Sequence, residues 1–232
     1  MKHFPILLAV VMAATAATAT PAATRITVTG EGSVAVIPDQ ATVNASIVTD
    51  APSADAATAQ NNTSYARLVA AVTAIGIARD DVTLSYYNLT YNPRPSPAPG
   101  EPAPTGRFGY IVNRSFAVKV RAVANAGKVV DALTRAGVTN VDNVSFGLAN
   151  PAQAQSEAIA KAMRDAQSKA AEIAKAAGLH IVRIGRITLG GSPGIVPMVR
   201  MAAMSAPAPP TVFDAGSVNV TSSLTVIFIA QP

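Results

Sequence analysis

The sequence predicts an α+β fold in which a mixed, mainly antiparallel sheet carries about three helices. Three observations support this prediction. Residues 150–178 form the longest periodic stretch, with apolar side chains at spacings of three and four residues, which is typical of one helix face. Apolar and polar residues alternate near both ends of the chain, over 26–47 and 218–229, as they do in half-buried strands. A helical pattern, a glycine and an alternating strand also follow one another twice, over 68–89 and 129–148.

The N-terminal residues have the features of a secretory signal peptide. A short basic region precedes residues 4–14, which are apolar but too few to span a bilayer. Small residues follow with the spacing of a cleavage site, so we expect residues 1–23 to be a signal peptide that is cleaved after Ala19 or Ala23. Because the chain contains no cysteine, the exported protein has no disulfides and must bury an ordinary apolar core.

Charge and hydropathy argue against two classes of partner. The formal net charge is +5 at pH 7, but Lys and Arg are spread along the chain without a basic cluster, which argues against nucleic-acid binding. Beyond the signal peptide, the apolar segment at 224–230 is far too short for a membrane helix. We therefore expect no transmembrane segment after signal cleavage, and one α+β domain over residues 24–232.

The domain is expected to begin with two strands. A strand pattern starts at residue 26, is interrupted by Gly30 and Gly32, and resumes before a second strand at 41–47. We interpret the two glycines as a turn or bulge, because no basic residue or helix start follows them, as a phosphate-binding loop requires.

A helix over 53–75 is expected next, with Ser53 as its N-cap, followed by a strand at 81–91. Asp80 and Asp81 are adjacent carboxylates at the turn between them. We interpret them as solvated turn residues, because a catalytic pair would need a partner base, a buried cleft or metal-ligating neighbours.

Residues 92–106 contain six prolines and cannot form regular structure, so we expect a surface loop between two paired strands. A strand over 107–121, a helix over 124–136 and a strand over 138–148 follow. The similarity of the two helix–glycine–strand segments predicts two strand–helix–strand units. Internal duplication and convergence on the same local pattern both explain that similarity.

The helix over 150–178 is expected to lie close against a sheet, because its apolar face is mostly alanine. Asn150 and Gly178 suit its two ends. The predicted face consists of Ile159, Met163, Ala166, Ala170, Ile173 and Ala177. A strand over 181–189, a loop over 190–216 that is rich in Pro, Ala and Met, and a final strand over 218–229 complete the chain.

Several stretches together carry a family resemblance. They are ITVTGEG with the later PDQA (26–41), VSFGL before Asn-Pro (144–151), the alanine-rich pattern at 160–178, and the final loop and strand. As a set they resemble the SIMPL-domain family of bacterial envelope proteins, relatives of a kinase-associated signalling protein. The resemblance implies an α+β domain, a periplasmic or outer-membrane-associated location, large homo-oligomers and a role in envelope stress tolerance, including oxidative stress. The family has no accepted catalytic residues, so it assigns none here.

The residues themselves suggest no catalytic centre and no cofactor. His180 is the one histidine after the signal peptide, and its place just past a helix end favours an interaction with the helix dipole over catalysis. Zinc would need Cys/His clusters that the sequence lacks. An enzyme that uses carboxylates alone is a further alternative, because the sequence does not place them in space.

Three methionines, Met198, Met201 and Met204, are weak candidates for a metal site. Thioethers at a spacing of three suit Cu(I). Methionine is equally a flexible apolar filler of adaptable contacts, and its oxidation would fit a role in stress.

We therefore expect a non-enzymatic periplasmic protein that self-assembles into homo-oligomers through its strands and loops, with an envelope protein as a further candidate partner. The alternative is a periplasmic binding module that uses the Met-rich loop for Cu(I) or an apolar partner.

Overall fold

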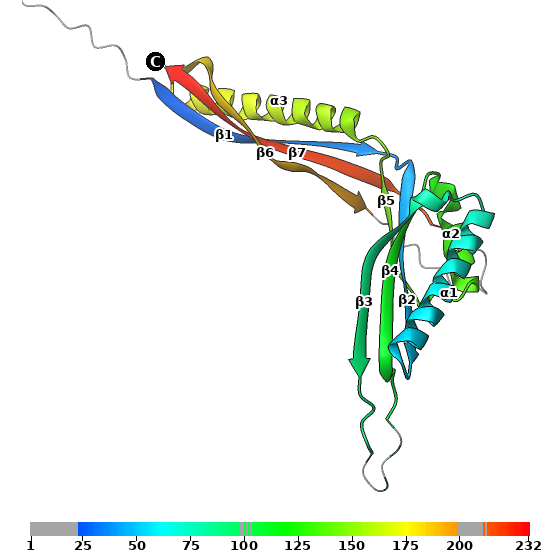
Figure 1. Ribbon diagram of the computed structural model, residues 1–232. Helices are drawn as coiled ribbons and strands as arrows, with labels where there is room; N and C mark the ends of the chain where they lie inside the picture. Colours follow the sequence, from blue (N-terminus) through cyan, green and yellow to red (C-terminus); the bar gives the residue numbers. More distant parts are fainter. Residues whose placement is uncertain (1–22, 98–99, 101, 103, 199–210, 212) are drawn as a thin grey trace, which may run out of the picture.

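The computed structural model describes residues 23–97, 100, 102, 104–198, 211 and 213–232. Two predicted features lie outside this part of the chain: residues 1–22 of the expected signal peptide, and the candidate metal ligands Met201 and Met204. The described residues contain three α-helices and seven strands, so the predicted α+β class is confirmed. The strands form two separate antiparallel sheets, in place of the single mixed sheet that the sequence predicted (Figure 1).

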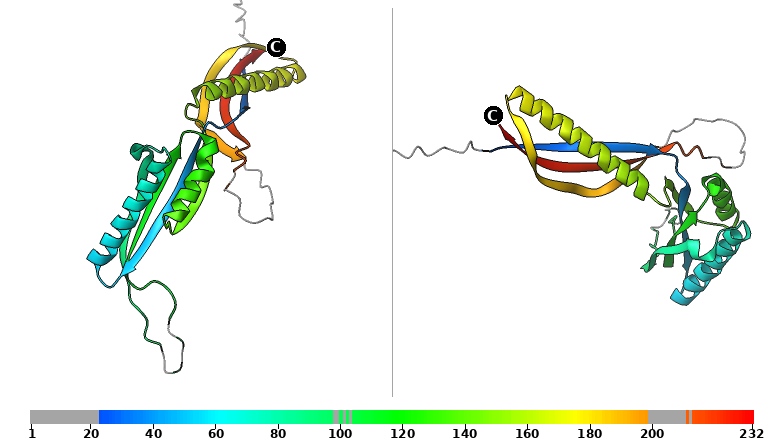
Figure 2. Two further views of the ribbon diagram at one scale, coloured as in Figure 1. Left: turned by 90° about the vertical axis from the view of Figure 1, so that its right-hand side faces the viewer. Right: turned by 90° about the horizontal axis from the view of Figure 1, so that it is seen from above.

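The first sheet joins the two ends of the described chain. It contains β1 (Thr24–Val36), β7 (Ser217–Gln231) and β6 (His180–Met198), in the order β1-β7-β6. Every second side chain of β7 is buried along the whole strand, as its alternating sequence predicts. The buried face lies under α3 (Ala152–Ala176), which packs across β1 and β7 (Figure 2).

β1 runs through Gly30 and Gly32 without a break, so the turn or bulge predicted there is wrong. The glycines lie where α3 crosses the strand. A Cβ atom built on Gly30 would lie 2.1 Å from the carbonyl oxygen of Ala162, and one on Gly32 would lie 2.0 Å from that of Ala158. Only a residue without a side chain allows the helix backbone to approach this closely.

The close approach of α3 to β1 also determines which face of the helix is buried. Its buried residues recur at every fourth position and are all alanine: Ala154, Ala158, Ala162, Ala166, Ala170 and Ala174. The predicted face shares only Ala166 and Ala170 with this set. Ile173 is 47% exposed and Ala177 is also exposed, because larger or differently placed side chains do not fit over the glycines. The predicted C-terminal end holds, since Gly178 has a left-handed φ of 67°. The predicted N-cap is wrong by one residue: Pro151 is the N-cap of α3, and Asn150 before it accepts a hydrogen bond from the Ala152 amide (3.1 Å).

Charged side chains of α3 also bind the outer edge of β1. Lys161 donates to the carbonyl oxygen of Ser33 (2.8 Å), and Lys169 donates to that of Thr29 (3.1 Å). Asp165 accepts from the amide of Glu31 (2.8 Å). These side chains form hydrogen bonds with main-chain groups through which β1 could otherwise pair with another strand.

β6 is longer than predicted. Its ladder with β7 continues past residue 189 to Met198, which lies opposite Ser217. Residues 190–198 therefore belong to a strand and not to the predicted loop over 190–216. Three register shifts interrupt the ladder, so the simple alternation on which the prediction relied is absent from β6.

The second sheet contains β3 (Val82–Asn92), β4 (Gly109–Val120), β2 (Gln40–Ala51) and β5 (Asn140–Gly147), in the order β3-β4-β2-β5. With α1 (Ala54–Ala74) and α2 (Ala126–Arg135), the chain order is β2-α1-β3 and then β4-α2-β5. These are the two strand–helix–strand units that the sequence predicts. In the sheet, β4 lies between β2 and β3, and β2 lies between β4 and β5. Each unit therefore has a strand of the other unit inserted between its own two strands, which is the split β-α-β arrangement of ferredoxin-like domains.

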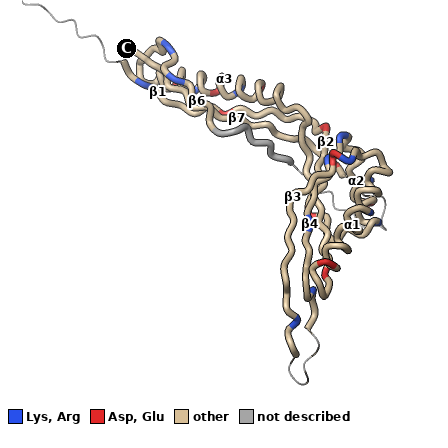
Figure 3. The backbone as a smooth tube through the Cα atoms, in the orientation of Figure 1, with Lys and Arg blue, Asp and Glu red and all other residues tan. Residues whose placement is uncertain are grey.

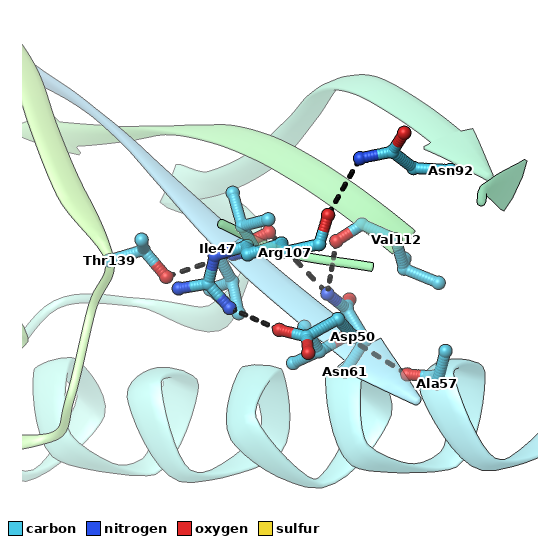
Figure 4. A network of polar contacts seen from close by, with 10 residues as sticks. Ile47, Asp50, Ala57, Asn61, Asn92, Arg107, Val112 and Thr139 are labelled. Carbon is cyan, nitrogen blue, oxygen red and sulfur yellow. Dashed lines mark hydrogen bonds and ion pairs between the residues drawn. The ribbon is translucent and has the colours of Figure 1, made fainter. Parts of the chain in front are cut away.

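The core of this second half lies between its sheet and its two helices. The largest fully buried side chains include Phe116 on β4, Leu68 on α1 and Leu133 on α2. Asn61 of α1 is fully buried as well, and its amide donates to the carbonyl oxygens of Ile47 (3.4 Å) and Val112 (3.5 Å) (Figure 4). One polar side chain thus ties the helix to both central strands.

The Pro-rich residues 92–106 connect β3 to β4, which are paired as far as Asn92 opposite Gly109. The prediction that they link paired strands is confirmed. Near the base of the connection, Asn92 donates to the carbonyl oxygen of Arg107 (2.7 Å) and Arg107 forms an ion pair with Asp50 (2.6 Å) (Figure 4).

The two sheets meet at an angle and give the molecule an elongated, bent shape (Figures 1 and 2). Two connections meet at the junction: the turn from β1 to β2 and the segment from β5 to α3. Asp39 accepts a hydrogen bond from the Ala149 amide (2.7 Å) and donates its own amide to Gly147 (3.1 Å), and Gln40 donates to Leu148 (3.1 Å). Among the described helices, none combines the length and hydropathy that a membrane span requires.

Replacing Ala166 by Leu is expected to lower the free energy of unfolding by about 1–3 kcal/mol, because the larger side chain overfills the space between α3 and β1. Gly30→Ala should act in the same direction, since its methyl group meets the helix backbone. Urea unfolding measures both effects. Ala160→Leu, at an exposed position of the same helix, is the control and should change stability by less than about 0.5 kcal/mol. Unchanged unfolding of the first two variants would contradict the close packing.

Candidate functional site

Each half of the molecule leaves one edge strand uncovered on its helix side. α3 packs on β1 and β7, and α1 packs on β2 and β4. α3 also contacts β6, where Ile181 packs against the core, but farther along β6, and along β3, large apolar side chains are exposed on the helix side. Contiguous apolar surface of this kind marks contact sites more often than isolated exposed residues do.

The first uncovered surface, the β6 strip, consists of Ile184, Ile187 and Leu189. These residues are 40–53% exposed, yet they lie opposite Phe228, Val226 and Leu224 of β7, which are buried under α3. Because residues directly opposite in an antiparallel pair point to the same face, the β6 strip continues the buried face beyond the edge of the helix.

The strip begins at a depression between the end of α3 and the start of β6. The depression has a volume of about 370 Å³ and is lined by Ala171, Ala174, Lys175, Gly178, Leu179, His180 and Ile181. His180 is exposed there, and no described residue forms a hydrogen bond or ion pair with its side chain. Among the described residues lining the depression there is neither a nucleophile for His180 to activate nor an acid to orient it.

The second uncovered surface, the β3 strip, consists of Leu84, Tyr87, Leu89 and Tyr91. They are 41–61% exposed, although Leu84 and Leu89 lie opposite the buried Phe116 and Val112. A groove of about 580 Å³ runs along α1 in the same half and is lined by Tyr65, Ala66, Val69, Ala70, Thr73, Ala74 and Arg79.

Arg114 links the groove to the β3 strip. Its guanidinium lies over the ring of Tyr65 (4.6 Å to the centroid) and over that of Tyr87 (5.2 Å), and it donates to Asn62 (2.7 Å). Cation–π stacking of this kind fixes the aromatic rings and leaves an apolar surface with a rigid cation inside it.

The outer edges of β1, β3 and β6 differ in how well they are blocked. Side chains of α3 bind the outer edge of β1, as described above. On β3, Arg79 donates to the carbonyl oxygen of Val82 (3.2 Å) at the start of the strand only. No hydrogen bond between described residues reaches the outer edge of β6. The strands with exposed apolar side chains are therefore also strands with free main-chain groups.

The candidate metal ligands are not brought together by the described residues. Met198 ends β6, opposite Ser217, while Met201 and Met204 lie outside the described part. Within that part, no group of three or more His, Cys, Asp or Glu residues is placed to hold a metal ion.

Comparison with known proteins identifies the family. The family model SIMPL, described as a protein of unknown function (DUF541), matches residues 26–228, which span both sheets. The chain belongs to the SIMPL family. It is also similar to the 26 kDa periplasmic immunogenic protein of Brucella melitensis, with 33% identity over 76% of this chain and 71% of the relative. The protein of the same name from Brucella abortus is 32% identical over the same shares.

In this SIMPL-family chain, the adjacent carboxylates Asp80 and Asp81 have different environments. Asp80 is exposed, as predicted, but the prediction of a solvated Asp81 is wrong, because its exposure is only 8%. Arg121 donates two hydrogen bonds of 2.9 Å to its carboxylate, one from Nε and one from Nη2. These bonds and the positive charge of Arg121 lower the pKa of Asp81 against the opposing effect of burial. The partner lies 40 positions away, so no local pattern indicated it.

Asp81→Asn is expected to lower the midpoint of thermal unfolding near neutral pH, because it removes the ion pair with Arg121. The folded pKa of Asp81 lies below the unfolded value of about 3.9. The ion pair therefore stabilises the protein above the unfolded pKa, and this contribution is lost as the pH falls through the folded pKa. The difference between wild type and variant should be constant from about pH 5 to 8 and should shrink below about pH 4.

Asp80→Asn is the matched control for this measurement, because Asp80 is exposed and forms no ion pair with a described residue. It should melt like the wild type across the range. High salt should also reduce the effect of Asp81→Asn, since the side chain of Arg121 is 76% exposed. An effect of Asp81→Asn that does not depend on pH would contradict an electrostatic role.

Proposed function

We propose that this protein is a non-enzymatic periplasmic envelope protein that assembles into homo-oligomers through its β3 and β6 strips. The observation that carries the proposal is the pair of uncovered edge strands, each with exposed apolar side chains and free main-chain groups. The predicted signal peptide and the periplasmic relatives support the location.

Strand pairing gives such edges a specific partner. An added strand satisfies main-chain donors and acceptors, while the apolar side chains beside it supply buried area. The β3 and β6 strips lie on different sheets, so each subunit has two distinct contact surfaces. Contacts between unlike surfaces extend an assembly into a ring or a filament, depending on whether the rotation closes.

Two carboxylates bear on the alternative of an enzyme that uses carboxylates alone. Asp81 is held by Arg121, and Asp165 is held by Lys169 and the Glu31 amide. Both carboxylates have a lowered pKa, mainly because of side-chain hydrogen bonds from these cations, whereas a general base near neutral pH needs a raised one. A role in envelope stress tolerance, including oxidative stress, and an association with the outer membrane or an envelope protein follow from the family resemblance and remain predictions.

Assembly is tested by the molar mass of the protein purified from the periplasm, measured by size-exclusion chromatography with light scattering. Ile187→Lys and Leu84→Lys place a charge in the β6 strip and the β3 strip, and each should reduce the mass of the wild-type oligomer. Thr188→Lys and Thr83→Lys are the matched controls. They are exposed neighbours on the opposite face of the same two strands, and they should leave the mass unchanged.

A monomeric wild-type protein at micromolar concentration would refute the proposed assembly. If only one of the two strip variants lowers the mass, the other strand is excluded from the interface. All four proteins should melt like the wild-type subunit, since the substituted side chains are exposed.

The alternative function, a binding module for Cu(I) or an apolar partner, rests on the methionine spacing alone. Changing Met198, Met201 and Met204 to Leu keeps apolar bulk and removes every sulfur ligand. We expect no difference in Cu(I) affinity between this variant and the wild type in a competition titration. Stoichiometric Cu(I) uptake by the wild type that the variant lacks would establish the binding module instead.

A further inference from the structure

The face of the first sheet opposite α3 carries three arginines around two isoleucines. Ile229 of β7 lies opposite Arg25 of β1 on one side and Arg183 of β6 on the other. Ile227, two positions along β7 on the same face, lies opposite Arg186. The register shift between Ile184 and Arg186 puts Arg183 and Arg186 on one face of β6 although they are three residues apart.

The three side chains border one depression. It has a volume of about 350 Å³ and is lined by Arg25, Arg183, Gly185, Arg186, Ile227 and Ile229. Residues directly opposite in an antiparallel sheet are about 4.5–5.5 Å apart between Cα atoms, so the arginines of β1 and β6 flank β7 at a separation that one small ligand can bridge. Figure 3 shows basic positions of β1 and β6 at the end of the first sheet that carries the C-terminus.

No described residue pairs with these three guanidinium groups. None of them has a hydrogen bond, an ion pair or an aromatic ring contact within the described part of the chain. Arg107, Arg114 and Arg121, by contrast, each have a side-chain hydrogen-bond partner. On the same face of β1, Glu31 lies six residues from Arg25, which is about 20 Å along a strand. Glu31 is the one carboxylate side chain on the described residues of these three strands, so no carboxylate side chain of the sheet lies in the depression to balance the arginines.

We propose that this depression binds a phosphate group. A phosphomonoester carries between one and two negative charges at neutral pH and has several oxygens that accept hydrogen bonds in different directions. Guanidinium groups donate paired, parallel hydrogen bonds that fit such oxygens. Three arginines from two strands approach from both sides of β7, and Ile227 and Ile229 form an apolar floor between them.

The floor strengthens the interaction, because charged hydrogen bonds beside apolar surface compete less with water. A carboxylate has a single charge and two oxygens in one plane, so it can satisfy fewer of the three guanidinium groups at once. Phosphate reaches this site either as a free small molecule or as the headgroup of an anionic phospholipid. Both present tetrahedral phosphate oxygens, but the phosphodiester of a lipid headgroup has one negative charge and two unesterified oxygens, fewer than free phosphate has.

Binding is measured on the purified wild-type protein in two arms. In one, inorganic phosphate is titrated and followed by calorimetry. In the other, the protein is sedimented with phosphatidylglycerol vesicles and, for comparison, with phosphatidylcholine vesicles. Binding to phosphate alone identifies a small-molecule site, and binding to phosphatidylglycerol vesicles identifies a lipid headgroup site. Binding in neither arm overturns the proposal.

Variants assign the binding to the three arginines. Arg183→Gln should weaken it about tenfold, the effect of losing one charge-assisted hydrogen-bonding group. Changing Arg25, Arg183 and Arg186 together to Gln should abolish it. The charge-matched control changes Arg67, Lys128 and Arg164 to Gln; these side chains are exposed and outside the depression. The control should retain wild-type binding, and equal weakening of both triple variants would show general electrostatic attraction and overturn the site.

Replacing the three arginines by Lys keeps the charge and removes the planar fork, so it should weaken binding while leaving the fold intact. Wild-type affinity in this lysine variant would contradict recognition by guanidinium groups. The molar mass of each variant is measured alongside. Because the arginines lie on the face of the sheet opposite the β6 strip, loss of phosphate binding with unchanged assembly separates this site from the proposed interface.

Discussion

The close contact between the alanine face of α3 and the glycines of β1 determines the rest of the first sheet. The helix backbone lies so near the strand that Gly30 and Gly32 have no room for a side chain. At this distance, Lys161, Asp165 and Lys169 reach the outer main-chain groups of β1. One packing contact thus places the helix, blocks one edge of the sheet and leaves the other edge, β6, without cover.

In both halves the helices leave one edge strand of the sheet exposed, with the same consequence. α3 spans β1 and β7, so the apolar side chains of β6 are exposed beyond it. α1 spans β2 and β4, and the aromatic and aliphatic side chains of β3 are exposed in the same way. The uncovered residues lie opposite core residues of the next strand. A partner on either strip would therefore extend an existing core.

Charges are distributed unevenly between the two halves. In the second half, three arginines interact within the subunit. Arg107 pairs with Asp50 at the base of the Pro-rich loop, Arg114 stacks on two tyrosine rings, and Arg121 binds the buried carboxylate of Asp81. In the first sheet, cations of α3 bind β1, while the three arginines on the opposite face have no described partner. The two faces of this sheet consequently differ in chemistry: an apolar strip lies beside α3, and a depression bordered by three arginines lies on the other side.

The sequence by itself determined the local structure: the α+β class, the cap at Ser53, the end of α3 at Gly178, the two strand–helix–strand units and the alternation of β7. These features depend on neighbours within a few residues, which a linear pattern contains. Tertiary structure alone decided which alanines of α3 are buried, why β1 needs Gly30, and that Arg121 holds Asp81. The exposed edges and the arginine cluster likewise arise from register between strands distant in the chain, and periodicity contains no information about that register.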